Sequence, residues 1–212
     1  MCGIAGIMTV SGSPPNDATL QALARALAHR GPDGAGRTIS GGVGLAQTRL
    51  AIIDLETGDQ PLYAPLKCGD PKTGDVKGNQ KKAALVANGE IYNYVELKLD
   101  MGRVDFKTKS DCEPPLHLYL RHGLDFARHL RGMYALAVHD PAEDCLVLAR
   151  DPFGIKPLYY AETSTGFVFA SEPQALFKAG CLEPALNTEA RDELLQLQFT
   201  TGSETIFEGV HR

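Results

Sequence analysis

The sequence predicts a single domain of the α+β class, in which antiparallel strands are flanked by helices. Strand-like segments follow one another through short turns in the second half of the chain, which is typical of hairpins. Helical segments lie on either side of these strands and do not alternate with them, so a parallel sheet built from βαβ units is not expected. With 212 residues, 43% of them hydrophobic, the chain can bury roughly 70% of its unfolded surface, enough for one large domain.

The N-terminal segment predicts a strand followed by a helix. Residues 3–10 are apolar and predict a buried strand, which the turn-rich segment 11–16 ends. Asp17 can cap a helix, because the apolar residues after it recur at helical spacing through about residue 29. We therefore expect this helix to pack its apolar face on a sheet.

The middle of the chain predicts two strands separated by loops. Residues 30–36, RGPDGAG, predict a loop, and residues 42–55 predict a strand. Residues 65–82 are polar and rich in Gly and Lys, which predicts an exposed insertion and not a domain linker. Residues 83–93 then predict a buried strand that ends at Gly89.

The second half of the chain predicts a helix and a run of short strands. Residues 114–123 predict a helix with proline in its first turn. An antiparallel meander is predicted next, with strands at residues 133–140, 145–150, 156–160 and 166–171. A short helix at residues 173–179 follows the meander.

Charge and hydropathy exclude several classes of partner. The formal net charge is −5 and no basic stripe is present, so neither nucleic acid nor an anionic membrane is an expected partner, and a small soluble ligand is favoured. No Lys or Arg precedes the apolar N-terminal segment and no apolar run could cross a bilayer, so we expect a cytoplasmic protein. The five cysteines are scattered without a CxxC pair, which argues against a disulfide framework and a metal site.

Cys2 occupies an unusual position, because chain ends are seldom packed. Removal of Met1 would leave Cys2 with a free α-amine (reference pKa about 7.7–8.0) beside its own thiol (about 8.5), so one residue could supply both nucleophile and base. Two alternatives stay open: a small buried hydrophobe, or a pair with a histidine. The candidates for that pair are His29, His117, His122, His129, His139 and His211.

Eight segments in order now identify a resemblance across nearly the whole chain. They are MCGIAGI at the start, HRGPDGAG from His29, RLAIIDL from Arg49, QPL from Gln60, NGEIYN from Asn88, SDCE from Ser110, RDPFGIKPLYY from Arg150 and FASE from Phe169. The chain resembles the glutaminase domain of the glutamine-hydrolysing asparagine synthetase family, a class II glutamine amidotransferase. The resemblance implies the N-terminal nucleophile hydrolase fold, in which two antiparallel sheets lie between helical layers.

The resemblance also implies a reaction and its catalytic residues. Cys2 would attack the side-chain amide of glutamine, release ammonia and form a glutamyl thioester, which water hydrolyses to glutamate. The Cys2 amine would carry the proton. By the same resemblance, the side-chain amide of Asn88 and the backbone N–H of Gly89 form the oxyanion hole, and Gly89 would let the backbone approach the reacting centre. Taken alone, Asn-Gly is a turn signal.

Two charged residues suit the zwitterionic end of glutamine. A guanidinium among apolar residues needs an anion or several acceptors, and the resemblance places Arg49 on the α-carboxylate and Asp111 on the α-amino group. Backbone groups would complete the pocket at Arg49, Leu50, Ala51, Ile52, Ile53, Asn88, Gly89 and Glu90. The alternatives are a strand-edge charge facing water for Arg49 and a helix cap for Asp111.

Two further pairs of charged residues are predicted to be structural. Arg30 and Asp33 predict a loop that closes near the nucleophile, and Arg150 and Asp151 predict an internal ion pair.

Family members with synthetase activity carry a second domain, so we expect residues 1–212 to be the amidotransferase domain, ending before that domain. No P-loop pattern is present and the SGG at residues 40–42 is taken as coincidence, so no cofactor is expected in this domain; ATP and Mg would bind only in the missing synthetase domain. Expected partners are glutamine and that downstream domain, with a homodimer left open. The alternative functions are amidation of another acceptor and a non-catalytic module that senses glutamine.

Overall fold

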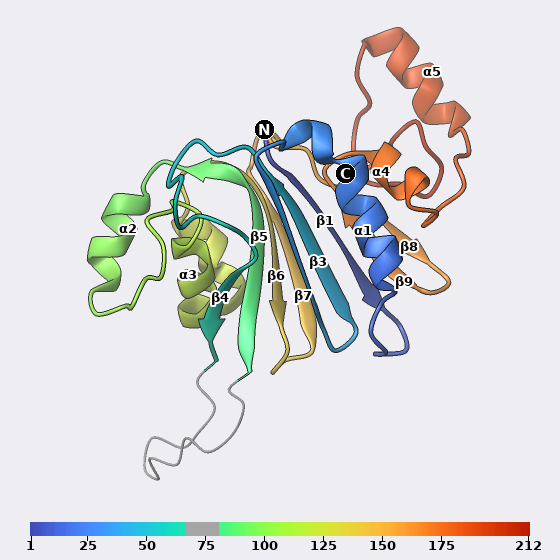
Figure 1. Ribbon diagram of the computed structural model, residues 1–212. Helices are drawn as coiled ribbons and strands as arrows, with labels where there is room; N and C mark the ends of the chain where they lie inside the picture. The colour runs from blue at the N-terminus through green and yellow to red at the C-terminus, as the bar shows by residue number, and fades with distance from the viewer. Residues whose placement is uncertain (67–80) are drawn as a thin grey trace.

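A computed structural model describes residues 1–66 and 81–212. Two antiparallel sheets lie face to face, and helices cover the outer face of each (Figure 1). Helices α1 (Asp17–Ala26) and α4 (Pro173–Lys178) cover one sheet, and α3 (Pro114–His122) covers the other. Helix α2 (Tyr94–Met101) packs beside α3. This arrangement confirms the predicted α+β class and its order of layers.

The first sheet has the strand order β2-β3-β1-β9-β8. Its strands are β1 (Gly3–Thr9), β2 (Gly34–Ser40), β3 (Val43–Arg49), β8 (Tyr159–Thr163) and β9 (Gly166–Ala170). Strand β1 lies at the centre, where Ile4 pairs with Gln47 of β3 and Gly6 pairs with Phe169 of β9. The N-terminal strand therefore has a neighbour on both edges, which fixes the start of the chain.

The second sheet has the strand order β4-β5-β6-β7. Its strands are β4 (Leu62–Pro65), β5 (Lys82–Ile91), β6 (Gly132–Asp140) and β7 (Cys145–Arg150). Strand β4 pairs with β5 only as far as Leu62 opposite Leu85, whereas β6 pairs with β5 from Ala84 to Ile91. From Ala87 onward, the outer edge of β5 therefore has no neighbouring strand in the described structure and is covered by loops.

The helix ends follow ordinary capping chemistry. Asn16 caps α1 through its side chain, which accepts a hydrogen bond from Ala18 N at 2.8 Å, so the predicted cap at Asp17 is wrong by one residue. Helix α3 begins at Pro114, as predicted, because proline lacks the N–H that a first turn leaves unused. Asn187 caps α5 (Thr188–Leu197), which stands away from the sheets in Figure 1.

Three apolar layers hold the structure together. The layer between the sheets contains Ile4, Leu45, Val86, Ala135 and Phe169, all buried. The two outer layers join each sheet to its helices. Within each strand the inner and outer layers take alternate residues, as the two-residue period of a strand requires. Among the described residues, no helix has the length and apolar character needed to cross a bilayer.

Four sequence-based predictions differ from the structure. The strands after α3 do not form one meander: β6 and β7 belong to the second sheet, whereas β8 and β9 belong to the first. The predicted loop at residues 30–36 ends early, because β2 begins at Gly34. Strand β3 ends at Arg49 and leaves residues 50–55 as a loop, and β5 continues past Gly89 to Ile91. Of the predicted insertion at residues 65–82, positions 67–80 lie outside the described part.

Candidate active site

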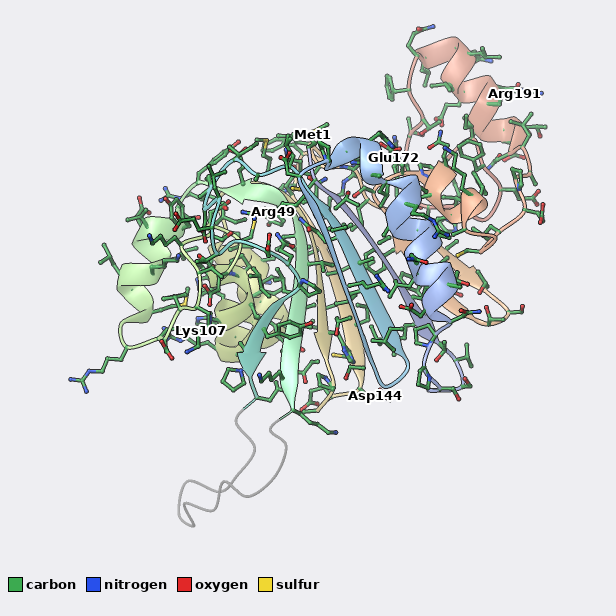
Figure 2. The ribbon with its side chains drawn as sticks, in the orientation of Figure 1. Met1, Arg49, Lys107, Asp144, Glu172 and Arg191 are labelled. Atoms are coloured by element: carbon green, nitrogen blue, oxygen red, sulfur yellow. The ribbon has the colours of Figure 1, made fainter. Side chains whose placement is uncertain are left out.

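The inner layer changes from apolar to polar at one end of the sheets. On β3 the inward series runs Val43, Leu45, Gln47 and Arg49, and on β5 Asn88 follows Ala84 and Val86 at the same two-residue spacing. Cys2 stands two residues before Ile4, whose side chain is in this layer. Figure 2 shows Met1, Arg49 and Glu172 at this end of the molecule and Asp144 at the other.

A cavity of about 400 Å³ opens at this end. It is lined by nine of the ten residues that the sequence singles out: Cys2, Arg49, Leu50, Ile52, Ile53, Asn88, Gly89, Glu90 and Asp111. Ala51 is absent from the lining, and its backbone N–H bonds to the Asp33 carboxylate at 2.9 Å. These nine residues come from four separate stretches of sequence that meet in one cavity.

The Cys2 thiol is held at the mouth of this cavity by the start of the loop after β3. Its Sγ accepts a hydrogen bond from Leu50 N at 3.4 Å and lies 3.6 Å from Leu50 O. Arg30 donates from Nε to the Cys2 carbonyl at 3.0 Å and from Nη1 to Glu172 at 2.7 Å. The loop with Arg30 and Asp33 therefore closes near the nucleophile, as predicted.

A second thiol, that of Cys112, lines the same cavity. Its Sγ donates to Gly89 O at 3.7 Å, and burial together with the nearby Asp111 carboxylate raises its pKa well above the usual range. Because the thiolate is the reactive form, Cys112 is a poor nucleophile. Cys2, which is half-exposed, is the better candidate.

None of the chain's histidines contributes to the lining of this cavity. All six lie in the described part of the chain, and His29, for example, pairs with Glu172 on the surface. The alternative of a cysteine–histidine pair therefore finds no support here.

The free edge of β5 presents one backbone N–H to the cavity. Ala87 N donates to Gln60 Oε1 at 2.6 Å, and Ile91 N donates to Asp111 Oδ2 at 2.7 Å. Backbone groups two residues apart point to the same edge of a strand, so Gly89 N lies between these two anchored positions. The side chains of Gln60 and Asp111 thus take the place of a neighbouring strand and frame the Gly89 N–H.

The side chain of Asn88 carries a donor without a protein partner. Asn88 is buried, and its Nδ2 makes no hydrogen bond within the described part of the chain. A buried amide left unpaired costs about 1–3 kcal/mol, so such a group is expected only where a ligand or water completes it. Asn88 and Gly89 lie inside β5, and the alternative interpretation of this dipeptide as a turn is therefore wrong.

The close pairing of β5 and β6 requires a glycine at position 89. A Cβ at this position would lie 2.6 Å from Met133 O and 2.7 Å from Tyr134 Cβ, both on the neighbouring strand β6. This glycine therefore lets β5 and β6 pair closely beside the cavity, and its role in approach to the reacting centre stays a prediction.

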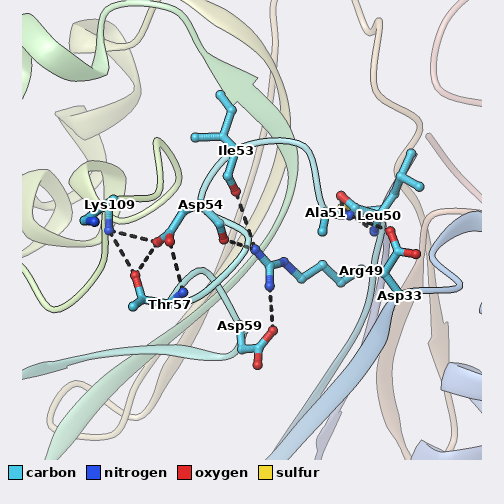
Figure 3. Close-up of polar contacts among 10 residues, drawn as sticks. Asp33, Arg49, Leu50, Ala51, Ile53, Asp54, Thr57, Asp59 and Lys109 are labelled. Carbon is cyan, nitrogen blue, oxygen red and sulfur yellow. Dashed lines mark hydrogen bonds and ion pairs between the residues drawn. The ribbon is translucent and has the colours of Figure 1, made fainter.

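Arg49 is buried and its guanidinium is enclosed by the loop that follows β3 (Figure 3). Nη1 donates to Asp59 Oδ1 at 2.7 Å, while Nη2 donates to the carbonyls of Ile53 and Asp54. Gly58 packs against it, since a Cβ there would lie 2.7 Å from Nη2. The alternative of an edge charge facing water is therefore wrong.

The loop around Arg49 is itself anchored by Asp54, whose φ of 55° places it in the left-handed region. Its carboxylate accepts from Thr57 N and Lys109 N at 2.9 and 2.8 Å. Burial alone would raise the pKa of Asp54, but these hydrogen bonds and the charge of Arg49 lower it overall. An ionised carboxylate thus joins this loop to the segment that carries Asp111.

Asp111 is buried and does not cap a helix. Its Oδ2 accepts from Ile91 N, and Ser110 Oγ lies 3.5 Å from its Oδ1. The residue at the cap position of α3 is Glu113, so the helix-cap alternative for Asp111 is wrong. Arg49 and Asp111 therefore place one cation and one anion in the same cavity.

Several lining residues were not singled out by the sequence: Gln47, Gly58, Gln60, Ser110, Cys112, Met133, Ile155 and Lys156. Gln47 is buried with its Nε2 unpaired in the described structure. Its position two residues before Arg49 on one strand was the available signal. Lys156 is also buried, in the loop before β8, where the sequence wrongly predicted the start of a strand.

The predicted ion pair between Arg150 and Asp151 is not formed. Arg150 donates to the carbonyls of Lys156 and Gly154 at 2.7 and 2.8 Å. Asp151 instead accepts hydrogen bonds from backbone N–H groups, including those of Ile155 and Lys156, both at 3.0 Å. The two residues therefore shape one loop through backbone contacts, and this loop brings Lys156 to the cavity.

Comparison with known proteins gives one consistent family. The sequence profile of the glutamine amidotransferase domain family matches residues 1–212. The chain is 38% identical over 180 residues to glutamine-hydrolyzing asparagine synthetase 2 of Bacillus subtilis, covering 84% of this chain and 22% of that protein. It is 39% identical over 178 residues to glutamine-hydrolyzing asparagine synthetase 3 of Arabidopsis thaliana, covering 83% of this chain and 28% of that protein. The chain thus spans about a quarter of the length of these relatives.

Solved structures share the fold. The glutamine phosphoribosylpyrophosphate amidotransferase of B. subtilis, complexed with ADP and GMP, superposes with a TM-score of 0.64 at 24% identity. The superposition covers 84% of this chain and 44% of that one. At this identity the likeness establishes the arrangement of layers and strands.

Proposed function

Because the chain belongs to the glutamine amidotransferase domain family, we propose that it hydrolyses the side-chain amide of glutamine to glutamate and ammonia, with Cys2 as the nucleophile. The observation that carries this proposal is the meeting of the Cys2 thiol with the unpaired amide of Asn88 in one cavity. Arg49 and Asp111 line the same cavity and suit the charged end of an amino acid.

The reaction proceeds in two halves. The Cys2 sulfur attacks the carboxamide carbon, and the thiol proton passes through the Cys2 α-amine to the leaving nitrogen. The carbon–nitrogen bond then breaks, ammonia leaves and a glutamyl thioester remains. Water adds to the thioester and gives its proton to the amine; the carbon–sulfur bond breaks, and the proton returns to sulfur. This route requires removal of Met1, which is 57% exposed and accessible to a peptidase.

Charge that develops on the amide oxygen is met by donors already in place. The Asn88 side-chain amide and the Gly89 N–H are the proposed oxyanion donors. Asn88 is buried and Gly89 is framed by Gln60 and Asp111, so neither donor has to reorganise as the charge forms.

The opposite end of the substrate is recognised by its charges. Arg49 binds the α-carboxylate and Asp111 the α-amino group, with backbone groups of residues 49–53 and 88–90 completing the pocket. Because Asp111 Oδ2 already accepts from Ile91 N, its Oδ1 is the oxygen directed to the ammonium. The carboxamide is thereby fixed at the Cys2 end.

The acceptor of the ammonia depends on the rest of the full-length protein. The relatives named above are glutamine-hydrolyzing asparagine synthetases roughly four times longer than this stretch. We therefore propose that a downstream synthetase domain of the same chain uses the ammonia to amidate aspartate at the expense of ATP. A cofactor-free amidotransferase domain remains a prediction.

The test measures glutamate release from L-glutamine by the wild type and by Cys2→Ala, with the free Cys2 terminus verified by mass spectrometry. We expect turnover in the wild type and a loss of at least about 10³-fold in the variant, since the nucleophile is gone. Cys112→Ala is the matched control and should retain turnover, because its thiol stays protonated. Equal activity in wild type and Cys2→Ala would refute the mechanism.

A further inference from the structure

The guanidinium of Arg49 is already occupied by groups of its own chain. Nη1 donates to Asp59 Oδ1 at 2.7 Å, and Nη2 donates to the carbonyls of Ile53 and Asp54 (Figure 3). Any bidentate bond between a guanidinium and a carboxylate uses at least one Nη nitrogen. Nη2 already donates to two carbonyls, and Nη1 donates one of its two N–H groups to Asp59, so a ligand carboxylate bound across Nη1 and Nη2 competes with these partners.

Asp59 is the partner that can leave. Its side chain is 83% exposed, whereas that of Arg49 is 9% exposed. The carbonyls of Ile53 and Asp54 are backbone groups in the loop anchored by Thr57 and Lys109. The carboxylate of Asp59 can rotate into water because its side chain is already mostly solvated, and the incoming ligand carboxylate then replaces it as the counter-charge of Arg49.

Gly58 lies close against the guanidinium on its Nη2 side. The position of a Cβ on Gly58 lies 2.7 Å from Arg49 Nη2, so the chain presses directly on the cation. Arg49 is therefore confined by its own loop, whereas Asp59 faces solvent. A buried cation also needs a counter-charge whenever the cavity is empty, and Asp59 supplies it.

We propose that Asp59 is a specificity-determining residue that competes with the α-carboxylate of the substrate for Arg49. This inference rests on the proposed function, since it takes Arg49 as the site for that carboxylate. Asp59 belongs to the chain and carries a carboxylate, the same group that the ligand presents to Arg49. Only the fraction of molecules in which Asp59 has left Arg49 can therefore bind the ligand carboxylate at this site. The apparent affinity is lowered by that fraction.

The test compares Asp59→Asn with the wild type. If about one molecule in five has Asp59 released, removing its charge lowers KM for L-glutamine about three- to tenfold and leaves kcat unchanged, because the α-carboxylate contact is the same in the ground and transition states. Calorimetry in a Cys2→Ala background should show the same gain in binding. Affinity for 4-aminobutanamide, which is glutamine without its α-carboxylate, should not change.

Two controls separate charge from position. Asp59→Glu keeps the competing carboxylate and should retain the wild-type KM within about twofold. Asp17→Asn removes the exposed partner of Arg37, a pair with a similar distance of 2.8 Å far from the cavity, and should have no effect. A higher KM for glutamine in Asp59→Asn would mean that Asp59 orients Arg49, and it would overturn the proposal.

The two measurements also separate this inference from the proposed function. If glutamine binds more tightly to Asp59→Asn but the wild type never releases ammonia, the hydrolase assignment fails and the role of Asp59 stands. If the wild type hydrolyses glutamine and Asp59→Asn neither lowers KM nor strengthens binding, the role of Asp59 fails alone. If glutamine does not bind at all, both fail.

Discussion

At the scale of single residues, the cavity is marked by polar atoms that lack the partners their burial demands. Asn88 Nδ2 and Gln47 Nε2 are both buried and unpaired within the described structure, at the end of a layer that is otherwise apolar. Each would be costly in a region built only for stability. Their shared location in the cavity indicates a place where a ligand or water completes both groups.

We expect Asn88→Asp to lower kcat about 10²- to 10³-fold with little change in KM, because the donor acts on charge that exists only in the transition state. Aspartate keeps the shape of asparagine but replaces the Nδ2 donor with an oxygen. Steady-state glutaminase kinetics provide the measurement. Asn16→Asp is the matched control, since aspartate caps a helix as well as asparagine does. A loss in kcat below about fivefold would show that Asn88 is not an oxyanion donor.

The sequence predicted which residues line the cavity more successfully than it predicted which groups these residues contact. Cys2, Arg49, Asn88 and Asp111 could be named because their neighbours form motifs. Gln47 could not, because a glutamine in a strand has no motif and becomes notable only when its burial is known. The partner of Arg49 was equally hidden, since Asp59 lies in a loop whose path sequence does not specify.

At the scale of elements, short strands were easier to locate than to assign to a sheet. Period-two apolar patterns indicated β6, β7, β8 and β9, yet the loop at residues 151–158 takes the chain from one sheet to the other. That crossing depends on hydrogen bonds of Asp151 and Arg150 to backbone groups, and a hydrophobic pattern does not encode these. The predicted hairpins β6–β7 and β8–β9 are both present, but they lie in different sheets and not in one meander, and β8 begins at Tyr159 and not at residue 156.

The start of helix α3 links helix capping to the site. The carboxylate of Glu113 accepts from Lys107 N and Thr108 N, both at 2.7 Å, and lies 3.4 Å from His117 Nε2. Burial alone would raise the pKa of Glu113, but these hydrogen bonds lower it from 4.5 to about 2. The segment that they hold leads directly into Asp111, so Glu113 indirectly positions a candidate substrate ligand.

This lowered pKa predicts how stability depends on pH. A carboxyl group whose pKa is lower in the folded state stabilises the protein above its unfolded pKa of 4.5, and the contribution disappears as pH falls toward about 2. The wild type should therefore lose about 2 kcal/mol more of its free energy of unfolding than Glu113→Gln between pH 6 and 3. Urea unfolding at several pH values measures this difference. Glu143→Gln, in an exposed turn, should follow the wild type; parallel curves for Glu113→Gln would contradict the prediction.

At the scale of the whole molecule, the two sheets form one unit because their inner faces share an apolar core. The cavity that Cys2 lines lies at the end of the sheets where this apolar core ends. Strand β1 lies at the centre of its sheet and begins beside Cys2, so the nucleophile is attached to the best-supported strand. Figure 1 shows the N-terminus at the end of the sheets where β1 and β5 lie close together. The layer order was predicted from the family resemblance, whereas the residue patterns alone predicted only the α+β class.

Phe169 provides a test of this shared core. It is fully buried in the layer between the sheets, and its ring lies against Gly6, where a Cβ would be 2.4 Å from Cε1. Phe169→Ala should lower the free energy of unfolding by about 3–5 kcal/mol. The substitution leaves a void between the two sheets, and the sheets cannot move together to fill it without losing other contacts. In thermal unfolding, the melting temperature should fall by about 10 °C or more.

Phe153→Ala is the control, at a side chain that is 88% exposed, and it should change the free energy of unfolding by less than about 0.5 kcal/mol. If Phe169→Ala lowered the free energy of unfolding as little as Phe153→Ala, the contact between the sheets could not depend on this layer. The position of Cys2 would then have to be fixed by other contacts.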